Sequence, residues 1–449
     1  MKTKLLLLLS LFVLQSNAQC WDKISSGGYH TLAIADDGTL WAWGYNNVGQ
    51  LGDGSTTHRS QPVKIGSDSN WSKITAGSFH SVAIKADGTL WVWGQNLYGQ
   101  LGTGNTTSSL VPIQIGAETN WKNIAAGQAF TLAVKTNGSL WSAGRNSDGQ
   151  LGINSLTDSA VFVQVGSNTD WDKVYCGPYH AVALTTSGLL YLWGDNSAGQ
   201  LGFQHYIDRR VPTIFASNIA FTTVAANAYS TIAIRTDGKI WRAGTICPIP
   251  SSTYQMREYI TTESDWTNVS IGDNFLLATR SNGTLWAIGT NNYGQFGLSS
   301  PASSTSFVQV ASSVEQNNID SNLFSSLYLS TNQQLNSTGQ NHVGQLGNGT
   351  MDNSSAFGQI TCPSEIVLSS EEFDSNNTFS IYPNPVSNQL NISTPFEIQK
   401  LVIYDVTGKQ VKYQEGNTTA IDVQDLKSGF YLLEVTINDK KEVSKFIKQ

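Results

Sequence analysis

Charged residues and cysteines are scarce in this sequence, and long apolar runs are almost absent. Asp, Glu, Lys and Arg make up 13% of the 449 residues, with a formal net charge of −7. Between residues 19 and 363 no run of lysine and arginine could neutralise phosphates, which argues against binding to nucleic acid or to an anionic membrane. After the N-terminal segment no stretch approaches the length of about eighteen apolar residues that spans a bilayer, so no transmembrane helix is expected.

The N-terminal segment itself has the organisation of a secretory signal peptide. Two lysines precede an apolar run from Leu5 to Leu14, and small residues at 16–18 offer a cleavage site. We predict that residues 1–18 are a signal peptide and that the mature protein is exported. A lipoprotein acylated at Cys20 is the alternative, although the glutamine before it is a poor neighbour for that processing.

Motifs of common catalytic and metal sites are also missing. The sequence has no GxSxG motif, no zinc-type His/Glu spacing, no EF-hand loop and no CxxC pair. Its glycine-rich segments lack the lysine and the following helix of a phosphate-binding loop. We therefore expect a protein that is not an enzyme and that has no cofactor and no metal.

What the sequence does contain is a repeat of about fifty residues. The segment from Trp21 reads WDKISSGGYHTLAIADDGTLWAWGYNNVGQL and returns from Trp71 as WSKITAGSFHSVAIKADGTLWVWGQNLYGQL. Seven units can be followed, with the fifth and the seventh atypical. In the fifth, TICPIPSSTYQMREY from Thr245 replaces the recurring Gly-Gln-Leu-Gly, and a degraded seventh copy runs from about Asp320. Such self-similarity is the signature of a repeat architecture.

Each unit reads as four short strands. In the second, WSKITAG is followed by HSVAIKADGTLWVWG, which is two β-rich runs around an Asp-Gly hairpin turn, and then by PVKIG-like residues after a glycine-rich loop. One four-stranded sheet cannot cover both of its faces, whereas sheets arranged radially cover one another. The predicted fold class is therefore all-β: a seven-bladed β-propeller at residues 19–363, with a small β-sandwich after it.

The repeat pattern GxxH[ST]xA[IV]xxDGxLWxWGxNxxGQLG resembles that of the regulator-of-chromosome-condensation family, over roughly residues 20 to 362. The resemblance implies a seven-bladed propeller. The founder of the family is a guanine-nucleotide exchange factor that binds chromatin, yet the same fold serves in bacteria as secreted binding and inhibitor proteins. Because fold does not fix function, we carry over the architecture and not the chromatin role.

A second domain follows the repeats. An acidic, Ser/Asn-rich linker is predicted at 364–378 and about six or seven alternating strands at 379–449. The domain contains YPNP at Tyr382, DVTGK at Asp405, LKSGFY at Leu426 and a KFIK terminus. These motifs resemble the C-terminal sorting domain of Bacteroidetes type IX secretion cargo. The resemblance implies the type IX machinery as a partner and a secreted or outer-surface location; an adhesive sandwich is the alternative.

Four cysteines in an exported chain suggest disulfide bonds. Cys20 precedes the first strand of the propeller and Cys362 follows its last strand, so a bridge between them would join the two ends of the ring. A second bridge could join Cys176 and Cys247. The alternative, of equal weight, is that Cys176 is a small buried residue without a bridge.

Three histidines, His30, His80 and His180, recur at one repeat position. Three histidines suggest a metal site, but these belong to different units, and Phe or Ser occupies the same repeat position in the other units. We interpret them as structural residues that hydrogen-bond to a neighbouring loop. The recurring Asp-Gly and Gly-Gln-Leu-Gly segments are interpreted as turns.

The position just before the histidine slot is the candidate binding site. We place it in the turn at the mouth of the central channel, where five of seven units have an aromatic residue; Tyr98 and Tyr293 lie nearby, before their Gly-Gln pairs. The slot residues are Tyr29, Phe79, Ala129, Tyr179, Tyr229, Asn274 and Phe324. The rings either close the channel mouth or bind an extracellular protein or glycan. Among acids, the register places Asp273 near the mouth and Asp148 further out, which is thin support for glycan processing.

Overall fold

The computed structural model describes residues 21–245, 253–259, 263–299, 303–362, 379–405, 409–437 and 440–449. The chain folds as two compact units, Met1–Cys362 and Pro363–Gln449. The predicted signal peptide and linker, together with Cys20 and Cys247, lie outside the described residues. No helix in the described ranges is long and apolar enough to cross a membrane.

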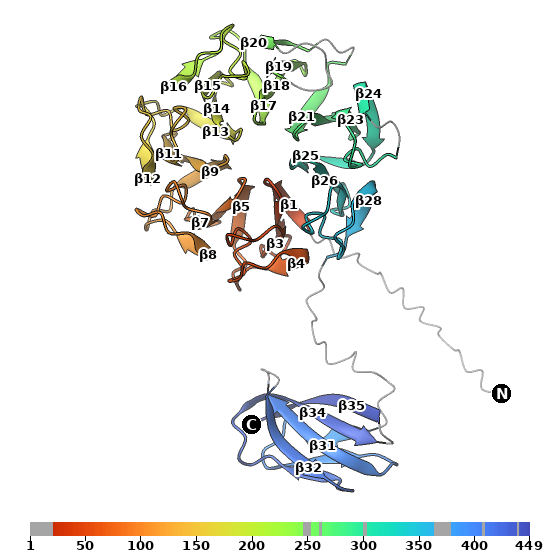
Figure 1. Cartoon of the computed structure of the whole chain (residues 1–449). Helices are drawn as coiled ribbons and strands as arrows, with labels where there is room; N and C mark the ends of the chain where they lie inside the picture. Colours follow the sequence, from red (N-terminus) through yellow and green to blue (C-terminus); the bar gives the residue numbers. More distant parts are fainter. Residues whose placement is uncertain are drawn as a thin grey trace, which may run out of the picture. The chain divides into compact units, whose positions relative to one another are not determined.

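The first unit is a ring of seven four-stranded antiparallel sheets, which confirms the predicted propeller (Figure 1). Blades one and two comprise β1 (Trp21–Ser26), β2 (His30–Ala35), β3 (Leu40–Gly44), β4 (Arg59–Lys64), β5 (Trp71–Ala76), β6 (His80–Lys85), β7 (Leu90–Gly94) and β8 (Ser109–Gln114). Blades three and four comprise β9 (Trp121–Ala126), β10 (Phe130–Lys135), β11 (Leu140–Gly144), β12 (Ser159–Gln164), β13 (Trp171–Cys176), β14 (His180–Thr185), β15 (Leu190–Gly194) and β16 (Arg209–Ile214). Blades five to seven comprise β17 (Phe221–Ala226), β18 (Ser230–Arg235), β19 (Ile240–Gly244), β20 (Thr253–Glu258), β21 (Trp266–Ile271), β22 (Phe275–Arg280), β23 (Leu285–Thr290), β24 (Ser303–Ala311), β25 (Val314–Ser321), β26 (Ser325–Ser330), β27 (Leu335–Gly339) and β28 (Ser354–Ile360).

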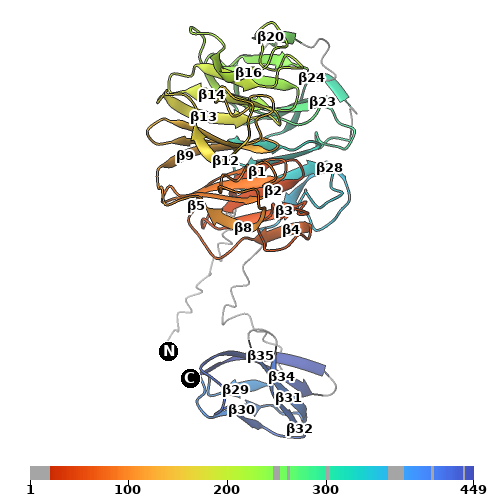
Figure 2. The same ribbon diagram turned by 60° about the vertical axis from the view of Figure 1, so that its left-hand side comes forward.

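Within each blade the strands follow one another from the centre of the ring to its circumference. Figure 1 shows β1, β5, β9, β13, β17, β21 and β25 around the central channel, and Figure 2 shows the ring turned by 60°. The second strand is the most deeply buried: every residue of β2, β6, β10 and β14 is buried. Aromatic residues of the third strand fill the space between blades, and Trp43, Trp93 and Trp193 are completely buried.

The Asp-Gly pairs form the turns between the second and third strands, as predicted. Asp37 Oδ1 accepts hydrogen bonds from the backbone N and the hydroxyl of Thr39, at 2.9 and 2.6 Å. The Thr39 hydroxyl oxygen in turn accepts from Trp41 Nε1 at 2.8 Å. The acid therefore orders the turn and, through the threonine, the indole behind it, so its recurrence has a structural cause.

The ring closes where the seventh blade meets the first. Asp320 Oδ2 accepts from the backbone N of Ser26 at 2.8 Å, and the carbonyl of Gln345 accepts from Trp43 Nε1 at 3.1 Å. Around these bonds Trp21 and Trp43 pack with buried leucines of β26 and β27. Residues about three hundred positions apart in sequence thus form the same kind of contact as consecutive blades do.

The fifth blade departs from this scheme, because it lacks the Gly-Gln-Leu-Gly segment. At other seams the glutamine carbonyl of this segment accepts a hydrogen bond from the next blade, for example Gln50 O from Trp93 Nε1 at 2.8 Å. The sixth blade has Leu276 and Ile288 at the positions of the usual donors, and both are buried. On the third strand of the fifth blade, the Arg242 guanidinium lies 5.1 Å from the centre of the Tyr259 ring.

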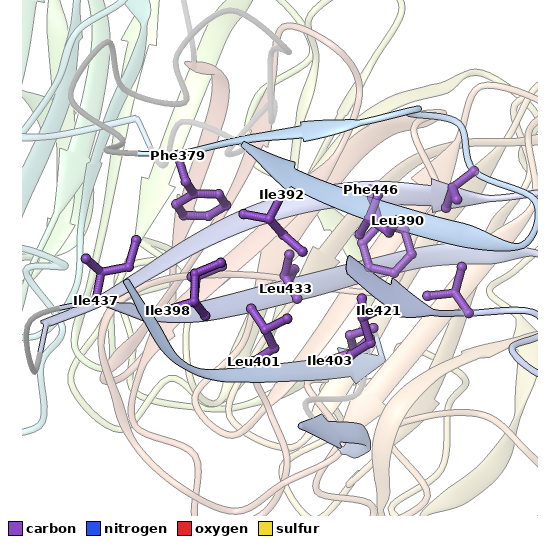
Figure 3. Packing of buried hydrophobic residues seen from close by; sticks show 13 residues of the cluster. Phe379, Leu390, Ile392, Ile398, Leu401, Ile403, Ile421, Leu433, Ile437 and Phe446 are labelled. Atoms are coloured by element: carbon purple, nitrogen blue, oxygen red, sulfur yellow. The ribbon is translucent and has the colours of Figure 1, made fainter. Parts of the chain in front are cut away.

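The second unit is a small sandwich of two antiparallel sheets. One sheet has the order β29-β30-β33 and the other β32-β31-β34-β35. The strands are β29 (Ser380–Tyr382), β30 (Gln389–Ser393), β31 (Ile398–Asp405), β32 (Gln410–Glu415), β33 (Ala420–Asp422), β34 (Gly429–Ile437) and β35 (Lys440–Lys448). Figure 3 shows the core between the sheets, where Leu390 and Ile392 face Leu401, Leu433 and Phe446. The predicted sandwich is confirmed.

Candidate binding face

The three histidines are buried hydrogen-bond donors between blades. His30 Nε2 lies 2.9 Å from Ser81 Oγ on β6, and His80 and His180 make the same contact with Thr131 and Thr231, at 3.0 and 2.9 Å. The structural interpretation of the histidines therefore holds. The partner differs from the expected one, because it is a strand hydroxyl of the next blade rather than a loop.

The hydroxyl contacts identify the tautomer. Ser81 Oγ donates its one proton to the carbonyl of Gln50 at 2.7 Å, so it must accept from His30 Nε2. Nδ1 of His30 then carries no proton and has no hydrogen-bond partner. Burial lowers the pKa of His30 to about 3, which keeps the ring neutral. Within the described residues no group of three or more His, Cys, Asp or Glu side chains could hold a metal.

These contacts also explain the glutamine of Gly-Gln-Leu-Gly. Its backbone carbonyl accepts a hydrogen bond from the hydroxyl that the histidine contacts. Its side-chain oxygen accepts a hydrogen bond from the backbone N two residues earlier, as Gln50 Oε1 does from Val48 N at 3.2 Å. Asn46 supports the same loop: its Oδ1 accepts from Leu51 N, and its Nδ2 donates to the carbonyls of Ser55 and Thr57. The segment is therefore a turn, as interpreted, and it also forms hydrogen bonds with the next blade.

The aromatic slot lies on the face where the first strand of each blade turns into the second. We call this the loop face, because the loops between third and fourth strands end on it as well. The backbone N of Tyr45 donates to the carbonyl of Tyr29 at 2.9 Å, and an equivalent bond is present in all seven blades. Slot residue and loop are therefore held together in every repeat.

The slot residues do not line the channel mouth, which corrects their expected position. The mouth is lined by the residue one position earlier, which is small in most blades, such as Gly28, Ser78 and Ala228. The aromatic side chains surround the mouth from one step further out. They range from half-buried, as Phe79 and Tyr179 are, to 51% exposed at Tyr229.

Side chains of three adjoining blades form one aromatic cluster on the loop face. The ring of Tyr29 lies 5.4 Å from His342 and 6.4 Å from Tyr45. Tyr45 continues to His58 at 4.8 Å and to Phe79 at 6.3 Å. The cluster therefore links blades seven, one and two into a continuous surface.

Two further groups extend this surface around the ring. Tyr293 lies 5.2 Å from Phe324, joining blades six and seven. The Arg145 guanidinium lies 5.8 Å from the ring of Tyr98 and 5.6 Å from that of Tyr179, joining blades two, three and four. Tyr98 and Tyr293 keep 41% and 38% of their surface exposed, so the groups present aromatic area to solvent.

Sequence reasoning missed Tyr45, His58, Arg145 and His342 as members of this surface. A signal for two of them was present, because Tyr45 and Arg145 occupy one repeat position, directly after the glycine that ends the third strand. That position varies between blades as strongly as the slot before the histidine does. The two histidines hold repeat positions as well: His58 accepts from the backbone N of Asn46, as Ser108 does from that of Asn96.

The loop face carries a negative charge at the mouth. Asp273 is the one charged residue among the described residues that line it. Burial raises the pKa of Asp273, and the pKa of Tyr29 is raised by burial and by the nearby Asp273. Further out, burial raises the pKa of Asp208, with Asp195 and Asp148 contributing through their negative charges.

Cys176 ends β13 beside the channel and is a free thiol. The predicted bridge between Cys176 and Cys247 is therefore wrong for this structure. The side chain lines the channel, and burial raises its thiol pKa well above the usual value, which fits the alternative of a small, unreactive residue. The bridge between Cys20 and Cys362 stays a prediction, since Cys20 lies outside the described residues.

Comparison with known families agrees with both domains. Two models of the regulator of chromosome condensation (RCC1) repeat match the chain, one at residues 37–84, 87–134, 137–184 and 187–234, the other at 21–50, 71–100, 121–150, 171–200 and 266–295. The secretion system C-terminal sorting domain matches residues 380–449. The chain is a propeller built from regulator-of-chromosome-condensation repeats that ends in a C-terminal sorting domain.

Individual relatives share the repeat and the fold. The ultraviolet-B receptor UVR8 of Arabidopsis thaliana is 42% identical over 43 residues, which is 10% of each chain, so the chain spans about a tenth of the length of the curated relatives it matches. Human WBSCR16 matches with a TM-score of 0.65 and 20% identity, over 72% of this chain and 94% of that one. A chain from the crystal structure of Kap60 bound to yeast RCC1 (Prp20) matches with a TM-score of 0.60 and 19% identity, over 68% and 78%. At these identities the structures show the fold alone.

Proposed function

We propose that the protein is a secreted or surface-displayed binding protein that holds an extracellular protein partner on the loop face of its propeller. The sorting domain indicates export by type IX secretion to the cell surface or outside, and thus an interaction with that machinery. The binding function then belongs to the propeller. One observation carries the proposal: partly exposed aromatic groups of neighbouring blades lie together around one mouth.

Physical chemistry favours this face for a partner. Tyrosine offers a large rigid surface with a polar tip, and such residues dominate the energetics of protein interfaces. The repeat needs no aromatic residue in the slot, because Ala129 and Asn274 occupy it in two blades with the same backbone hydrogen bond. The backbone of the repeat therefore does not require an aromatic residue in this slot.

The mouth favours binding over glycan processing. Hydrolysis of a glycosidic bond requires two carboxyl groups on either side of the bond, whereas Asp273 is the one carboxylate among the described residues that line the mouth. Stacking of sugar rings on the same aromatic residues is the alternative outcome of the experiment that follows.

The test compares two sets of alanine variants of the full chain. The first set replaces Tyr29, Phe79, Tyr179 and Tyr229; the control replaces Val111 and Ile113, exposed apolar residues of the outer strand β8. Purified protein is immobilised, envelope and culture extracts are passed over it, and captured proteins are identified by mass spectrometry. We expect a partner that the wild type and the control capture and that the first set loses.

The same surface is probed with a panel of soluble glycans. Glycan binding that the first set loses, without a captured protein, would replace the protein partner by a glycan. Capture that is unchanged in the first set would return the aromatic residues to a packing role.

A further inference from the structure

The channel mouth on the loop face is a narrow cavity built almost entirely from small neutral side chains. The turns of all seven blades line it, with glycine, alanine and serine at most positions. Asp273, from the turn between β21 and β22, is the exception. A single carboxylate in a neutral, partly buried mouth creates a site for one positive charge.

The carboxylate has no cation beside it. Its Oδ2 accepts a hydrogen bond from Asn274 Nδ2 at 2.6 Å, and none of the ion pairs between described residues includes it. The negative potential reaches the surrounding aromatic residues, because Asp273 contributes to the raised pKa of Tyr29, which lies two blades away. An incoming cation would thus be the first to neutralise Asp273.

Deeper in the channel lies a second carboxylate, which also carries a negative charge. Asp320 lies at the inner end of β25 and accepts hydrogen bonds from Ser26 N, Ser321 N and Ser270 Oγ at 2.8, 2.8 and 3.2 Å. All of these partners are neutral donors. The channel wall below the mouth is therefore negative as well.

The opposite end of the channel carries a positive charge. Lys23 and Lys73 line the cavity there, at the start of β1 and β5, and Lys23 is paired with Asp22 at 2.5 Å. Lys73 Nζ instead donates to the carbonyl of Lys122 and to Asn123 Oδ1, both at 2.6 Å, so neutral acceptors hold its charge in place. A cation is consequently attracted at the loop face and repelled at the far end.

Aromatic faces around the mouth add a second attraction for a cation. Tyrosine and phenylalanine rings bind ammonium and guanidinium groups through their negative faces. The pair Tyr293–Phe324 joins the blade of Asp273 to blade seven, and the cluster around Tyr29 continues from blade seven into blades one and two. A lysine or arginine side chain combines the required charge with an apolar stem that suits such a rim.

We propose that the mouth takes one lysine or arginine side chain of the protein partner, with its charged group at Asp273 and its stem among the small turn residues and the aromatic rim. The inference rests on the proposed function, because the same face must meet the partner. It adds the chemistry of the anchor: a basic side chain at the centre of the contact.

Labelled peptides test this with the full chain. Octapeptides with a central lysine, arginine, norleucine or glutamate between leucines and serines are titrated with the protein and followed by fluorescence anisotropy. We expect the lysine and arginine peptides to bind about tenfold more tightly than the norleucine peptide, the size of one charge-assisted contact. The glutamate peptide should bind more weakly than all others.

The variant Asp273→Asn should remove this preference, and Asp148→Asn, an acid further out on the same face, should leave it unchanged. Folding is not at risk, because seven blades carry six different residue types besides aspartate at this position. A preference that survives Asp273→Asn, or no binding of any peptide, would overturn the inference. Peptides that bind without preference, and whose binding is lost in the aromatic variants, would overturn it while leaving the proposed binding face intact.

Discussion

His30 Nε2 lies 2.9 Å from Ser81 Oγ of the neighbouring blade, and where phenylalanine replaces the histidine, at Phe130, the facing residue is Ala181. Phe130 and Ala181 are both completely buried. A seam between blades thus accepts a polar pair or an apolar pair, and also Phe275 beside Ser326, whose hydroxyl donates to Gln295 O at 2.6 Å. What it requires is a partner for each buried polar group, because an unpaired polar group in this position has no water to turn to.

Breaking one such pair should cost more than replacing it. Ser81→Ala leaves His30 Nε2 without an acceptor and should lower the free energy of unfolding by about 1–3 kcal/mol. The double variant His30→Phe/Ser81→Ala copies Phe130 and Ala181 and should recover most of this loss, since Gln50 O keeps its bond from Trp93 Nε1. Urea unfolding of the singles and the double measures the coupling; additive losses would show that His30 and Ser81 do not stabilise each other.

The buried histidines should make the propeller sensitive to acid. Burial lowers the pKa of His30 and His80 to about 3 and that of His180 to about 4. Between the ordinary value near 6.5 and these values the unfolded chain binds more protons than the folded one. Stability should therefore fall as the pH drops through this window, by up to about 5 kcal/mol for His30 and His80 and about 3 kcal/mol for His180.

The measurement is the free energy of unfolding at pH 7 and pH 4. A variant in which His30, His80 and His180 become Phe and their hydroxyl partners become Ala serves as control and should lose less stability on acidification. If both proteins lose the same amount, other groups control the acid response.

Asp320 should act in the opposite direction. Burial raises its pKa to about 6, so between about pH 4 and pH 6 the folded chain holds a proton that the unfolded chain releases. Its contribution to stability is present at low pH and is lost as the pH rises through 6. The stability difference between Asp320→Asn and wild type should shift in favour of the variant by about 2–3 kcal/mol from pH 4 to pH 8. A difference independent of pH would refute this.

Two glycines of the same repeat position separate backbone strain from crowding. Gly88 and Gly283 have φ values of +80° and +76°. A Cβ at Gly88 would lie 2.1 Å from the carbonyl oxygen of Thr119, whereas at Gly283 the nearest atom, Val314 O, is 3.7 Å away. Gly283→Ala should cost about 1 kcal/mol, for the left-handed backbone alone, and Gly88→Ala at least about 2 kcal/mol more. Equal losses would show that the turn at Gly88 relaxes freely.

The thiols can be assigned by mapping without reduction. Cys176 should be alkylated once the protein is denatured, and Cys20 and Cys362 should appear in one cross-linked peptide. In the chain-entropy model a bridge across so long a loop stabilises by about 4–5 kcal/mol. Cys362→Ser should therefore lower stability strongly and Cys176→Ser little. Alkylation of all four cysteines without reduction would exclude the bridge.

Most of the fold could be predicted because the repeat states it several times. Each copy of the tryptophan, the Asp-Gly turn and the Gly-Gln-Leu-Gly segment supports the same four strands, so errors in one copy are corrected by the others. The fifth blade is recognisable as atypical for the same reason. The contact between its Arg242 and Tyr259 could not be predicted, since no other copy contains it.

Contacts between blades are harder to predict than those within a blade. The register of the repeat shows that His30 starts a strand, but the hydroxyl that it meets lies 51 residues further on, on another sheet. The same limit applies to the aromatic slot, whose residues the register places one step too close to the channel, and to Arg145, which bridges three blades. Such positions depend on the angle between sheets, which a linear pattern does not contain.

The bonds that close the ring give the propeller a folding order and a shared fate. Ser26 and Trp43 obtain their partners from Asp320 and Gln345, which are synthesised about three hundred residues later. The first blade must wait, with one side uncovered, until almost the whole propeller has been made. Once the circle is complete no blade is terminal, so the ring has no frayed end from which unfolding or proteolysis could begin.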